Sequence, residues 1–275
     1  MERLTFTIPV PWEMKSDSFK VPFPLPDPLT YLKGKADAYN SGEGKLQGYD
    51  CPKCKNKGNI MVVTEDGRTV VRECSCSHIR RAIRYMEESG LDGDLKKYRF
   101  EGFEVTQPWQ QKMLDLAKAY AEKPEGWVLF SGQSGCGKTY LCTCIAKAIL
   151  YQEKPLQYLS WVRELRDLKN YENYKQRDEK LERFQNVEYL YIDDFLKVPG
   201  GMKPNAAELQ IAFTLIDSRY RRKKPTILST ELEPGEITAL DEALGSRILE
   251  MVGDRNVVVK RQKGRNYRLK ALRDG

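Results

Sequence analysis

The sequence predicts an α/β protein with a parallel sheet and flanking helices, preceded by a small module held together by cysteines. From residue 94 onward, apolar runs typical of strands alternate with helical patterns. A glycine-rich loop joins the first of these strands to a helix, and two close pairs of cysteines precede both. The expected strands cover residues 127–131, 157–161, 187–192, 226–229 and 256–261, and the main helices cover 109–122, 140–151, 162–184 and 206–222.

Length and composition set the organisation of the chain. The 275 residues allow an α/β domain over 94–275, a cysteine module over 49–93 and an N-terminal arm over 1–48. The net charge of +7 is compatible with nucleic acid as a partner. We find no apolar run long enough to span a membrane and no secretory signal pattern, so we expect a cytoplasmic protein without a membrane partner.

The arm is rich in proline, which prevents a regular helix in its first part. Apolar residues are interleaved with these prolines, so the arm is more than a linker. Two interpretations stay open: the arm docks on a partner, or it packs on its own protein.

The cysteine module contains two pairs separated by nineteen residues: Cys51, Cys54, Cys74 and Cys76. Strand-like runs at 59–64 and 68–72 lie between the pairs and are joined through Asp66-Gly67, a hairpin signal. Such a hairpin brings four thiolates together, and this predicts a zinc ribbon that binds Zn²⁺. His78 could replace Cys76 as a ligand, although we favour a surface histidine; reduced cysteines without metal are the other alternative.

A complete phosphate-binding loop, the P-loop, occupies residues 132–139 between the first strand and its helix. Its glycines let backbone N–H groups point at phosphate oxygens, and the helix N-terminus adds positive charge. Lys138 is expected to reach the β- and γ-phosphates of ATP, and the Thr139 hydroxyl to bind Mg²⁺. The predicted nucleotide contacts are Gly132, Gln133, Ser134, Gly135, Cys136, Gly137, Lys138, Thr139 and Tyr140.

A second motif completes the predicted ATP site. Residues 189–194 form an apolar strand that ends in Asp193 and Asp194, the Walker B arrangement. Strand alternation directs the two carboxylates to different sides. We therefore expect Asp193 to join the Mg²⁺ shell and Asp194 to face the γ-phosphate and orient or deprotonate water.

The order of the motifs resembles the DnaC/DnaI-type replicative helicase loaders, a branch of the AAA+ ATPases that also includes IstB-type transposition helpers. The resemblance covers residues 95–270 and is carried by blocks at 97–103, 132–139, 192–195, 216–220, 225–231, 245–248 and 266–268. It implies an AAA+ sheet with the helical lid absent or minimal, since only 28 residues follow Arg247.

Family roles can be transferred to individual positions. Arg247 resembles the arginine finger that acts in trans in a neighbouring subunit, which implies self-association through the ATP site; a surface ion pair with Glu250 or Asp241 is the alternative. Arg268 resembles the sensor-2 arginine, and Arg219 a second interface arginine. The sensor-1 position holds Glu231, so Thr230 could make that polar contact instead.

The resemblance implies an ATP-dependent loader that binds a hexameric replicative helicase through residues 1 to about 90 and delivers it to single-stranded DNA. Basic residues at 162–185, together with the aromatic residues Trp161, Tyr171 and Tyr174, suit contact with single-stranded DNA. Acidic residues in the same segment nearly cancel its charge, so a solvated helix is the alternative. Other hypotheses are an IstB-like helper on double-stranded DNA and an adaptor switched by ATP binding alone. The protein would act in the cytoplasm of a bacterium or of a phage host.

Overall fold

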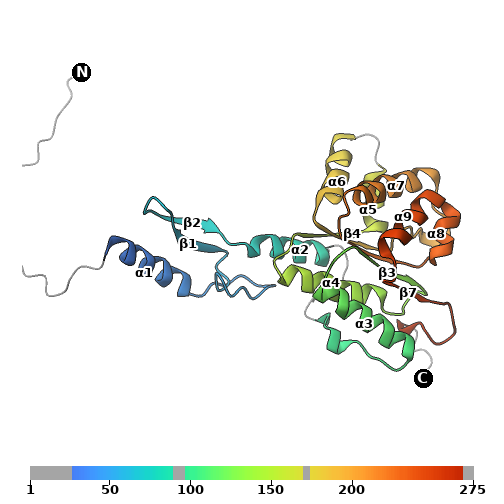
Figure 1. Ribbon diagram of the computed structural model, residues 1–275, viewed down its shortest axis with the longest axis horizontal. Helices are drawn as coiled ribbons and strands as arrows, with labels where there is room; N and C mark the ends of the chain where they lie inside the picture. Colours follow the sequence, from blue (N-terminus) through green and yellow to red (C-terminus); the bar gives the residue numbers. More distant parts are fainter. Residues whose placement is uncertain (1–26, 89–96, 170–173, 269–275) are drawn as a thin grey trace, which may run out of the picture.

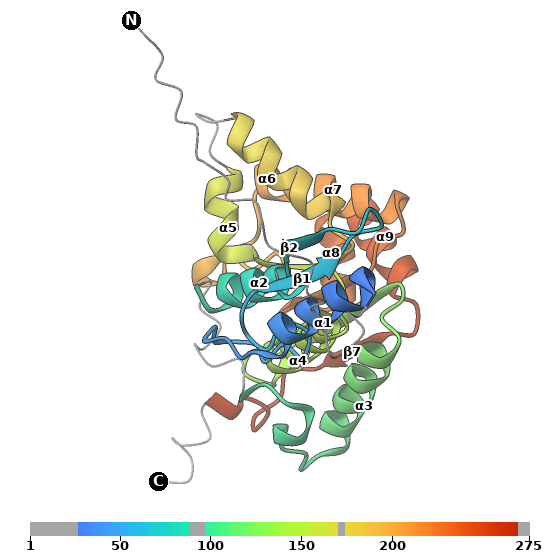
Figure 2. The same cartoon turned by 90° about the vertical axis from the view of Figure 1, so that its left-hand side faces the viewer.

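The computed structural model describes residues 27–88, 97–169 and 174–268. Figure 1 shows an α/β body from which a narrower N-terminal extension projects. The extension consists of helix α1 (Pro28–Ser41) and the hairpin β1 (Asn59–Val63) and β2 (Thr69–Glu73), and helix α2 (Cys76–Glu88) joins it to the body. In the end-on view of Figure 2, α1 and the hairpin lie in front of the body.

The body is built on a five-stranded parallel sheet, which confirms the predicted fold class. Its strand order is β4-β5-β6-β3-β7. The strands are β3 (Trp127–Gly132), β4 (Leu156–Ser160), β5 (Tyr189–Asp193), β6 (Thr226–Thr230) and β7 (Asn256–Val259). Because parallel strands end at the same edge, the carboxyl ends of β3, β5 and β6 meet, and a ligand crevice is expected there.

Helices cover both faces of the sheet (Figure 1). Alternate residues of β3 belong to two cores: Val128 and Phe130 pack with α3 and α4, whereas Trp127 and Leu129 pack with α7 and α9. This alternation is the expected result of a strand with both faces buried. The helices of the body are α3 (Pro108–Glu122), α4 (Lys138–Tyr151), α5 (Trp161–Leu168), α6 (Tyr174–Asn186), α7 (Ala206–Arg221), α8 (Pro234–Leu240) and α9 (Glu242–Val252), with short 3-10 turns η2 (Phe100–Gly102) and η3 (Pro199–Gly201).

The sequence did not predict α1, which begins at Pro28, the last proline of the N-terminal arm. Asp27 caps this helix, because its carboxylate accepts a hydrogen bond of 3.2 Å from the Thr30 N–H. Pro28 stands in the first turn, where its missing N–H costs nothing. The Asn40 side chain then pairs with the backbone of Met61 in β1 through two hydrogen bonds of 2.9 Å, so α1 is fixed to the hairpin.

One other element differs from the prediction. The helix expected over 162–184 is two helices, α5 and α6, and residues 170–173 between them lie outside the described residues. After β7 no α-helix occurs in the part of the chain that the structure describes. Among the described residues no helix is long and apolar enough to cross a membrane.

Candidate functional site

The P-loop joins β3 to α4, as predicted, although α4 begins at Lys138, two residues before the expected start at Tyr140. Its three glycines have φ angles of +102°, +73° and +101°, which side chains rarely tolerate. A Cβ at Gly132 would lie 2.1 Å from the carbonyl oxygen of Val259 in β7. The loop therefore needs glycine both for its turn and for its close contact with the neighbouring strand.

The two polar residues at the start of α4 point to different partners. The buried Lys138 donates from Nζ to the carbonyl oxygens of Gly132 and Gln133, both at 2.8 Å, so its ammonium group crosses the mouth of the loop. The Thr139 hydroxyl donates to Asp193 Oδ1 at 3.0 Å. This pairing places one hydroxyl and one carboxylate together, a donor set that suits Mg²⁺.

The two aspartates at the end of β5 lie in different environments. Asp193 is 7% exposed and accepts hydrogen bonds from the hydroxyls of Thr139 and Ser229. Burial raises the pKa of Asp193, and the hydrogen bond from Ser229 opposes that rise. The Asp194 N–H donates to Ser229 Oγ at 3.0 Å, and its own φ is +54°. The two carboxylates thus have different partners, since Asp194 pairs with Lys197 at 3.0 Å, and a left-handed turn begins at Asp194.

A cavity of about 280 Å³ lies beside the loop and collects side chains from distant parts of the chain. We call it the P-loop cavity. Its lining consists of Tyr98, Ser134, Gly135, Gly137, Lys138, Thr139, Tyr140, Asp194, Lys197, Glu231 and Arg268. Gly132, Gln133 and Cys136, also predicted as nucleotide contacts, belong to the loop but not to this lining. The cavity, its glycine-lined wall and its lysine fit a nucleotide phosphate chain.

The C-terminal segment closes one side of the P-loop cavity. The Tyr267 N–H donates to the Gly135 carbonyl at 2.9 Å, and the Asn266 side chain lies so close to Gly135 that a Cβ there would be 2.0 Å from its oxygen. Arg268, the predicted sensor-2 residue, follows directly and lines the cavity. Its position is compatible with a contact to a bound phosphate.

The aromatic side chains of Tyr98 and Tyr140 also line the cavity. The rings of Tyr98 and Tyr140 have centroids 5.2 Å apart, and Phe103 packs 5.8 Å from Tyr140. The Tyr140 hydroxyl also lies 2.9 Å from the Arg99 carbonyl oxygen, so the segment before α3 is tied to the P-loop helix. The sequence did not predict Tyr98 as a cavity residue, although Tyr98 lies in the block at 97–103 that carries part of the family resemblance.

One expectation for the sensor-1 position needs correction. The Thr230 hydroxyl is buried and donates to the Phe195 carbonyl at 2.8 Å, so the prediction that it faces the phosphate is wrong. Glu231 instead lines the cavity. Its Oε1 lies 2.9 Å from Lys197 Nζ, and this ion pair offsets the negative charge. The sequence did not predict Lys197, because its proximity arises from the turn that follows β5.

The two interface arginines differ sharply. Arg247, on α9, pairs through Nε with Asp217 at 2.9 Å, and its guanidinium lies 5.0 Å from the ring centre of Phe213. It lies outside the P-loop cavity of its own chain, and a quarter of its side chain is exposed. The alternative to an arginine finger was a surface ion pair of Arg247 with Glu250 or Asp241. Arg247 does form an ion pair, but its partner is Asp217.

The assignment of Arg219 to an interface is wrong. Arg219 is 0% exposed, and its guanidinium donates to the Thr226 hydroxyl and to backbone carbonyls. These carbonyls belong to Phe184, Val187, Glu188 and Pro225. Burial lowers the pKa of Arg219 to about 9. Arg219 therefore joins α6, α7 and the ends of β5 and β6 from inside the protein.

The expected DNA-binding helix also needs correction. Trp161 is fully buried and cannot stack on bases, whereas Tyr174 is 57% exposed, and Tyr171 lies outside the described residues. Lys180 forms ion pairs with Glu164 and Asp167, and Lys169 pairs with Glu208 at 2.8 Å. Several of the basic side chains are thus neutralised within the protein.

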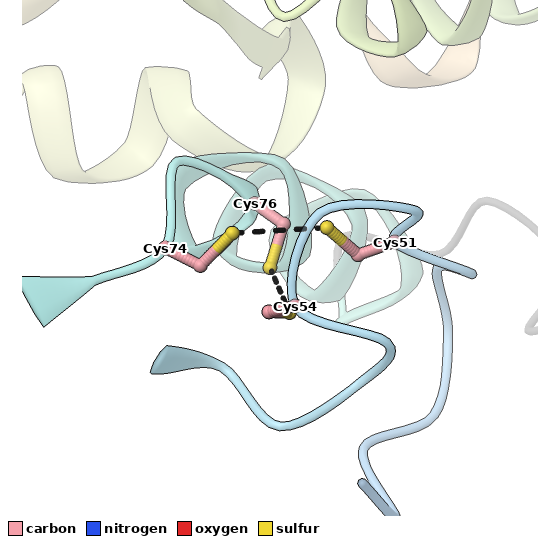
Figure 3. Close-up of side chains that lie close together, drawn as sticks. All are labelled: Cys51, Cys54, Cys74 and Cys76. Carbon is pink, nitrogen blue, oxygen red and sulfur yellow. Dashed lines mark hydrogen bonds between the residues drawn. The ribbon is translucent and has the colours of Figure 1, made fainter. Parts of the chain in front are cut away.

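The cysteine module brings its four thiols together (Figure 3). The sulfurs of Cys51, Cys54, Cys74 and Cys76 all lie within 4.8 Å of one another and are buried. The sulfurs of Cys51 and Cys74 are 3.7 Å apart, and those of Cys54 and Cys76 are 3.6 Å apart. A tetrahedral zinc with Zn–S bonds of about 2.3 Å has sulfur–sulfur edges of about 3.8 Å, so the cluster fits this ion.

The thiols lie in different electrostatic environments: burial raises the pKa of the Cys74 thiol and raises that of the Cys76 thiol to about 12. Burial opposes ionisation of Cys54, but the Gly58 N–H and the neighbouring thiols lower the pKa of its thiol to about 7. His78 does not belong to the cluster, although it is half-buried rather than on the surface. The four cysteines therefore form the candidate ligand set.

Comparisons with known proteins give the context for this geometry. The family model described as "IstB-like ATP binding protein" matches residues 63–274. The Phage-like element PBSX protein XkdC of Bacillus subtilis is 31% identical over 244 residues, which is 84% of this chain and 90% of that protein. The replicative helicase loader DnaC of Buchnera aphidicola from Schizaphis graminum is 23% identical over 196 residues, 68% of this chain and 76% of that protein.

A solved structure shows the same fold. The crystal structure of DnaI has a TM-score of 0.51 and 15% identity, and the match covers 66% of this chain and 99% of that one. The parallel sheet, the P-loop and the cavity beside it define a P-loop ATPase. Within this class, the chain belongs to the IstB-like ATP-binding family, which has helicase loaders among its relatives.

Proposed function

We propose that the protein is an ATP-dependent loader that binds a hexameric replicative helicase and delivers it to single-stranded DNA. The observation that carries this proposal is the N-terminal extension, which projects from the ATPase body in Figure 1 and carries exposed apolar side chains. Leu29 and Tyr31 on α1 are 45% and 62% exposed, and Val70 and Val71 on β2 are 39% and 48% exposed. A protein partner would remove this apolar surface from water.

The name of the Buchnera relative, a replicative helicase loader, indicates which partner to test. In the proposed division of the chain, residues 1–48 and the cysteine module bind the helicase, and residues 94–275 bind ATP. The boundary between the cysteine module and the ATP-binding part lies outside the described residues. The cysteine module would hold one Zn²⁺ that fixes the hairpin relative to α2.

In the proposed ATPase cycle, Lys138 and the P-loop N–H groups bind the phosphates, while Thr139 and Asp193 hold Mg²⁺. The ion supplies charge neutralisation of the phosphates when bound. Asp194 orients or deprotonates the attacking water, and Arg268 contacts the phosphate from the C-terminal segment. Arg247 would act in the cavity of a neighbouring subunit, since it lies outside its own.

A second candidate function is an IstB-like transposition helper on double-stranded DNA. The family match over residues 63–274 favours this function, because the matching family is described as IstB-like. It differs from the loader in partner and in DNA form. A loader should prefer single-stranded DNA and a helicase, whereas the helper should assemble on duplex DNA without a helicase.

The test is capture of the purified replicative helicase from the same genome by the full chain, with and without ATP. We expect capture by the wild type and loss of capture by the Val70→Ser/Val71→Ser variant. Leu249→Ser is the matched control, because Leu249 is 38% exposed but lies on α9 of the body. Equal capture by all three proteins, or no capture by any, would contradict the proposed docking.

A further inference from the structure

Lys197 occupies a position in the P-loop cavity that no motif assigns. Its Nζ lies 3.0 Å from Asp194 Oδ2 and 2.9 Å from Glu231 Oε1. The ammonium group thus bridges the carboxylate expected to act on water and the carboxylate at the sensor-1 position. Because Lys197 also lines the cavity, its side chain is accessible to a ligand there.

The backbone around Lys197 is arranged to direct this side chain. Asp194 and Leu196 both have positive φ angles, +54° and +60°, a conformation that costs free energy for residues with side chains. The neighbouring Phe195 and Leu196 are buried and anchor the turn, and the Lys197 N–H donates to the Asp194 carbonyl at 3.0 Å. A strained but anchored turn at the edge of a ligand cavity indicates a functional position.

The charges of the cavity show what Lys197 offsets. The cationic side chains that line it are Lys138, Lys197 and Arg268, and the anionic ones are Asp194 and Glu231. Burial disfavours both members of the Lys197–Glu231 pair in their charged forms, but pairing raises the pKa of Lys197 and lowers the pKa of Glu231. Both groups are therefore charged at neutral pH. Without Lys197, Asp194 and Glu231 would lose the ion-pair partner that they share, and Lys138 and Arg268 would be the remaining cations of the lining.

We propose that Lys197 is the residue that distinguishes ATP from ADP: Asp194 and Glu231 hold its ammonium group until the γ-phosphate of ATP displaces them. A terminal phosphate presents several charged oxygen atoms to an ammonium group, and hydrogen bonds of this charge-assisted kind are about twice as strong as neutral ones. Release of Lys197 frees Asp194 to accept a hydrogen bond from water. The contact thereby links the presence of the third phosphate to the state of the proposed base.

The location of the residues favours the γ-phosphate over the other two. The P-loop N–H groups bind the α- and β-phosphates of a P-loop nucleotide, and Lys138 reaches the β- and γ-phosphates from the loop side of the cavity. Lys197 and Glu231 follow the ends of β5 and β6, on the sheet side. A phosphate chain that starts at the loop and extends toward the sheet presents its terminal phosphate to them. This inference depends on ATP binding alone and not on helicase loading.

The experiment is calorimetric titration of the full chain with Mg²⁺-ADP and with the non-hydrolysable analogue Mg²⁺-AMPPCP. For Lys197→Met we expect AMPPCP affinity to fall on the order of tenfold, as for loss of one charged hydrogen bond, with ADP affinity nearly unchanged. Lys197→Arg keeps the charge and should retain most of the discrimination. Equal losses for both nucleotides would overturn the proposal and make Lys197 a structural tie of the turn.

A second variant separates competition from general electrostatics. Glu231→Gln removes the negative charge of one of the two groups that compete for Lys197, so AMPPCP affinity should rise several-fold. In the Lys197→Met background the same change should have a much smaller effect, because no ammonium group remains to be released. An equal gain in both backgrounds would contradict the proposal, since Glu231 would then repel the phosphate directly. Unchanged thermal unfolding of each variant excludes a folding defect, and failure to capture a helicase has no bearing on either titration.

Discussion

The ammonium nitrogen of Lys53, in the cysteine module, lies 2.6 Å from a carboxylate oxygen of Glu153, just beyond the C-terminal end of α4. The Tyr49 and Tyr151 rings reinforce this contact at a centroid distance of 5.2 Å. Since α4 begins at Lys138 of the P-loop, one helix connects the phosphate site to the proposed zinc site. The four cysteines also share a buried cluster with Ile145 and Ile149 of α4. The two parts of the protein are therefore packed as one structure.

The first prediction concerns zinc. We expect about one zinc per chain, bound by four thiolates. Cys51→Ser/Cys54→Ser should remove it and lower the unfolding temperature of the whole chain, because the cluster is continuous with α4. Metal analysis and thermal unfolding measure both effects. Cys144→Ser is the control, since this buried thiol lies outside the cluster and should leave zinc binding intact. Metal-free wild-type protein with an ordered hairpin would contradict the assignment.

The second prediction separates binding from turnover. Lys138→Ala should abolish nucleotide binding, because the lysine supplies positive charge to the bound phosphates. Asp194→Asn should bind ATP but not hydrolyse it, because the amide cannot take up a proton from water. Nucleotide titration and a phosphate-release assay distinguish the two. Hydrolysis by Asp194→Asn at the wild-type rate would remove that residue from the mechanism.

The third prediction concerns Arg247. Arg247→Ala should lower turnover on the order of a thousandfold with little change in ATP affinity, as for a residue that acts on a neighbour. Mixing Arg247→Ala with Lys138→Ala subunits should recover part of the activity, since each supplies what the other lacks. Arg221→Ala is the control, because Arg221 pairs with the same Asp217 but is 73% exposed. No recovery in assembled mixtures would leave Arg247 as an ion-pair residue.

The fourth prediction concerns Arg219. Arg219→Met should lower the free energy of unfolding by about 3 kcal/mol or more, because several buried carbonyls lose their donor. Denaturant unfolding measures this effect. The exposed neighbour Arg221→Ala should change stability by about 0.5 kcal/mol or less. A loss of assembly without a loss of stability in Arg219→Met would restore the interface interpretation.

The sequence was informative where a local pattern determines structure and less so where tertiary contacts do. The apolar strands, the P-loop glycines and the Asp66-Gly67 hairpin could be predicted, because each depends on residues adjacent in the chain. Arg219 could not, because it is buried only where carbonyls from three segments converge on it. Lys197 could not either, because a left-handed turn at Asp194 brings it to the cavity.

Delivery of the helicase is the central claim, and a loading assay tests it most directly. Purified replicative helicase is incubated with circular single-stranded DNA, ATP and this protein, and DNA-bound hexamers are measured after gel filtration. We expect the wild type to increase the bound helicase severalfold and Lys138→Ala to give no increase. The same amount of bound helicase with and without the wild-type protein, or an effect on duplex circles alone, would contradict the account.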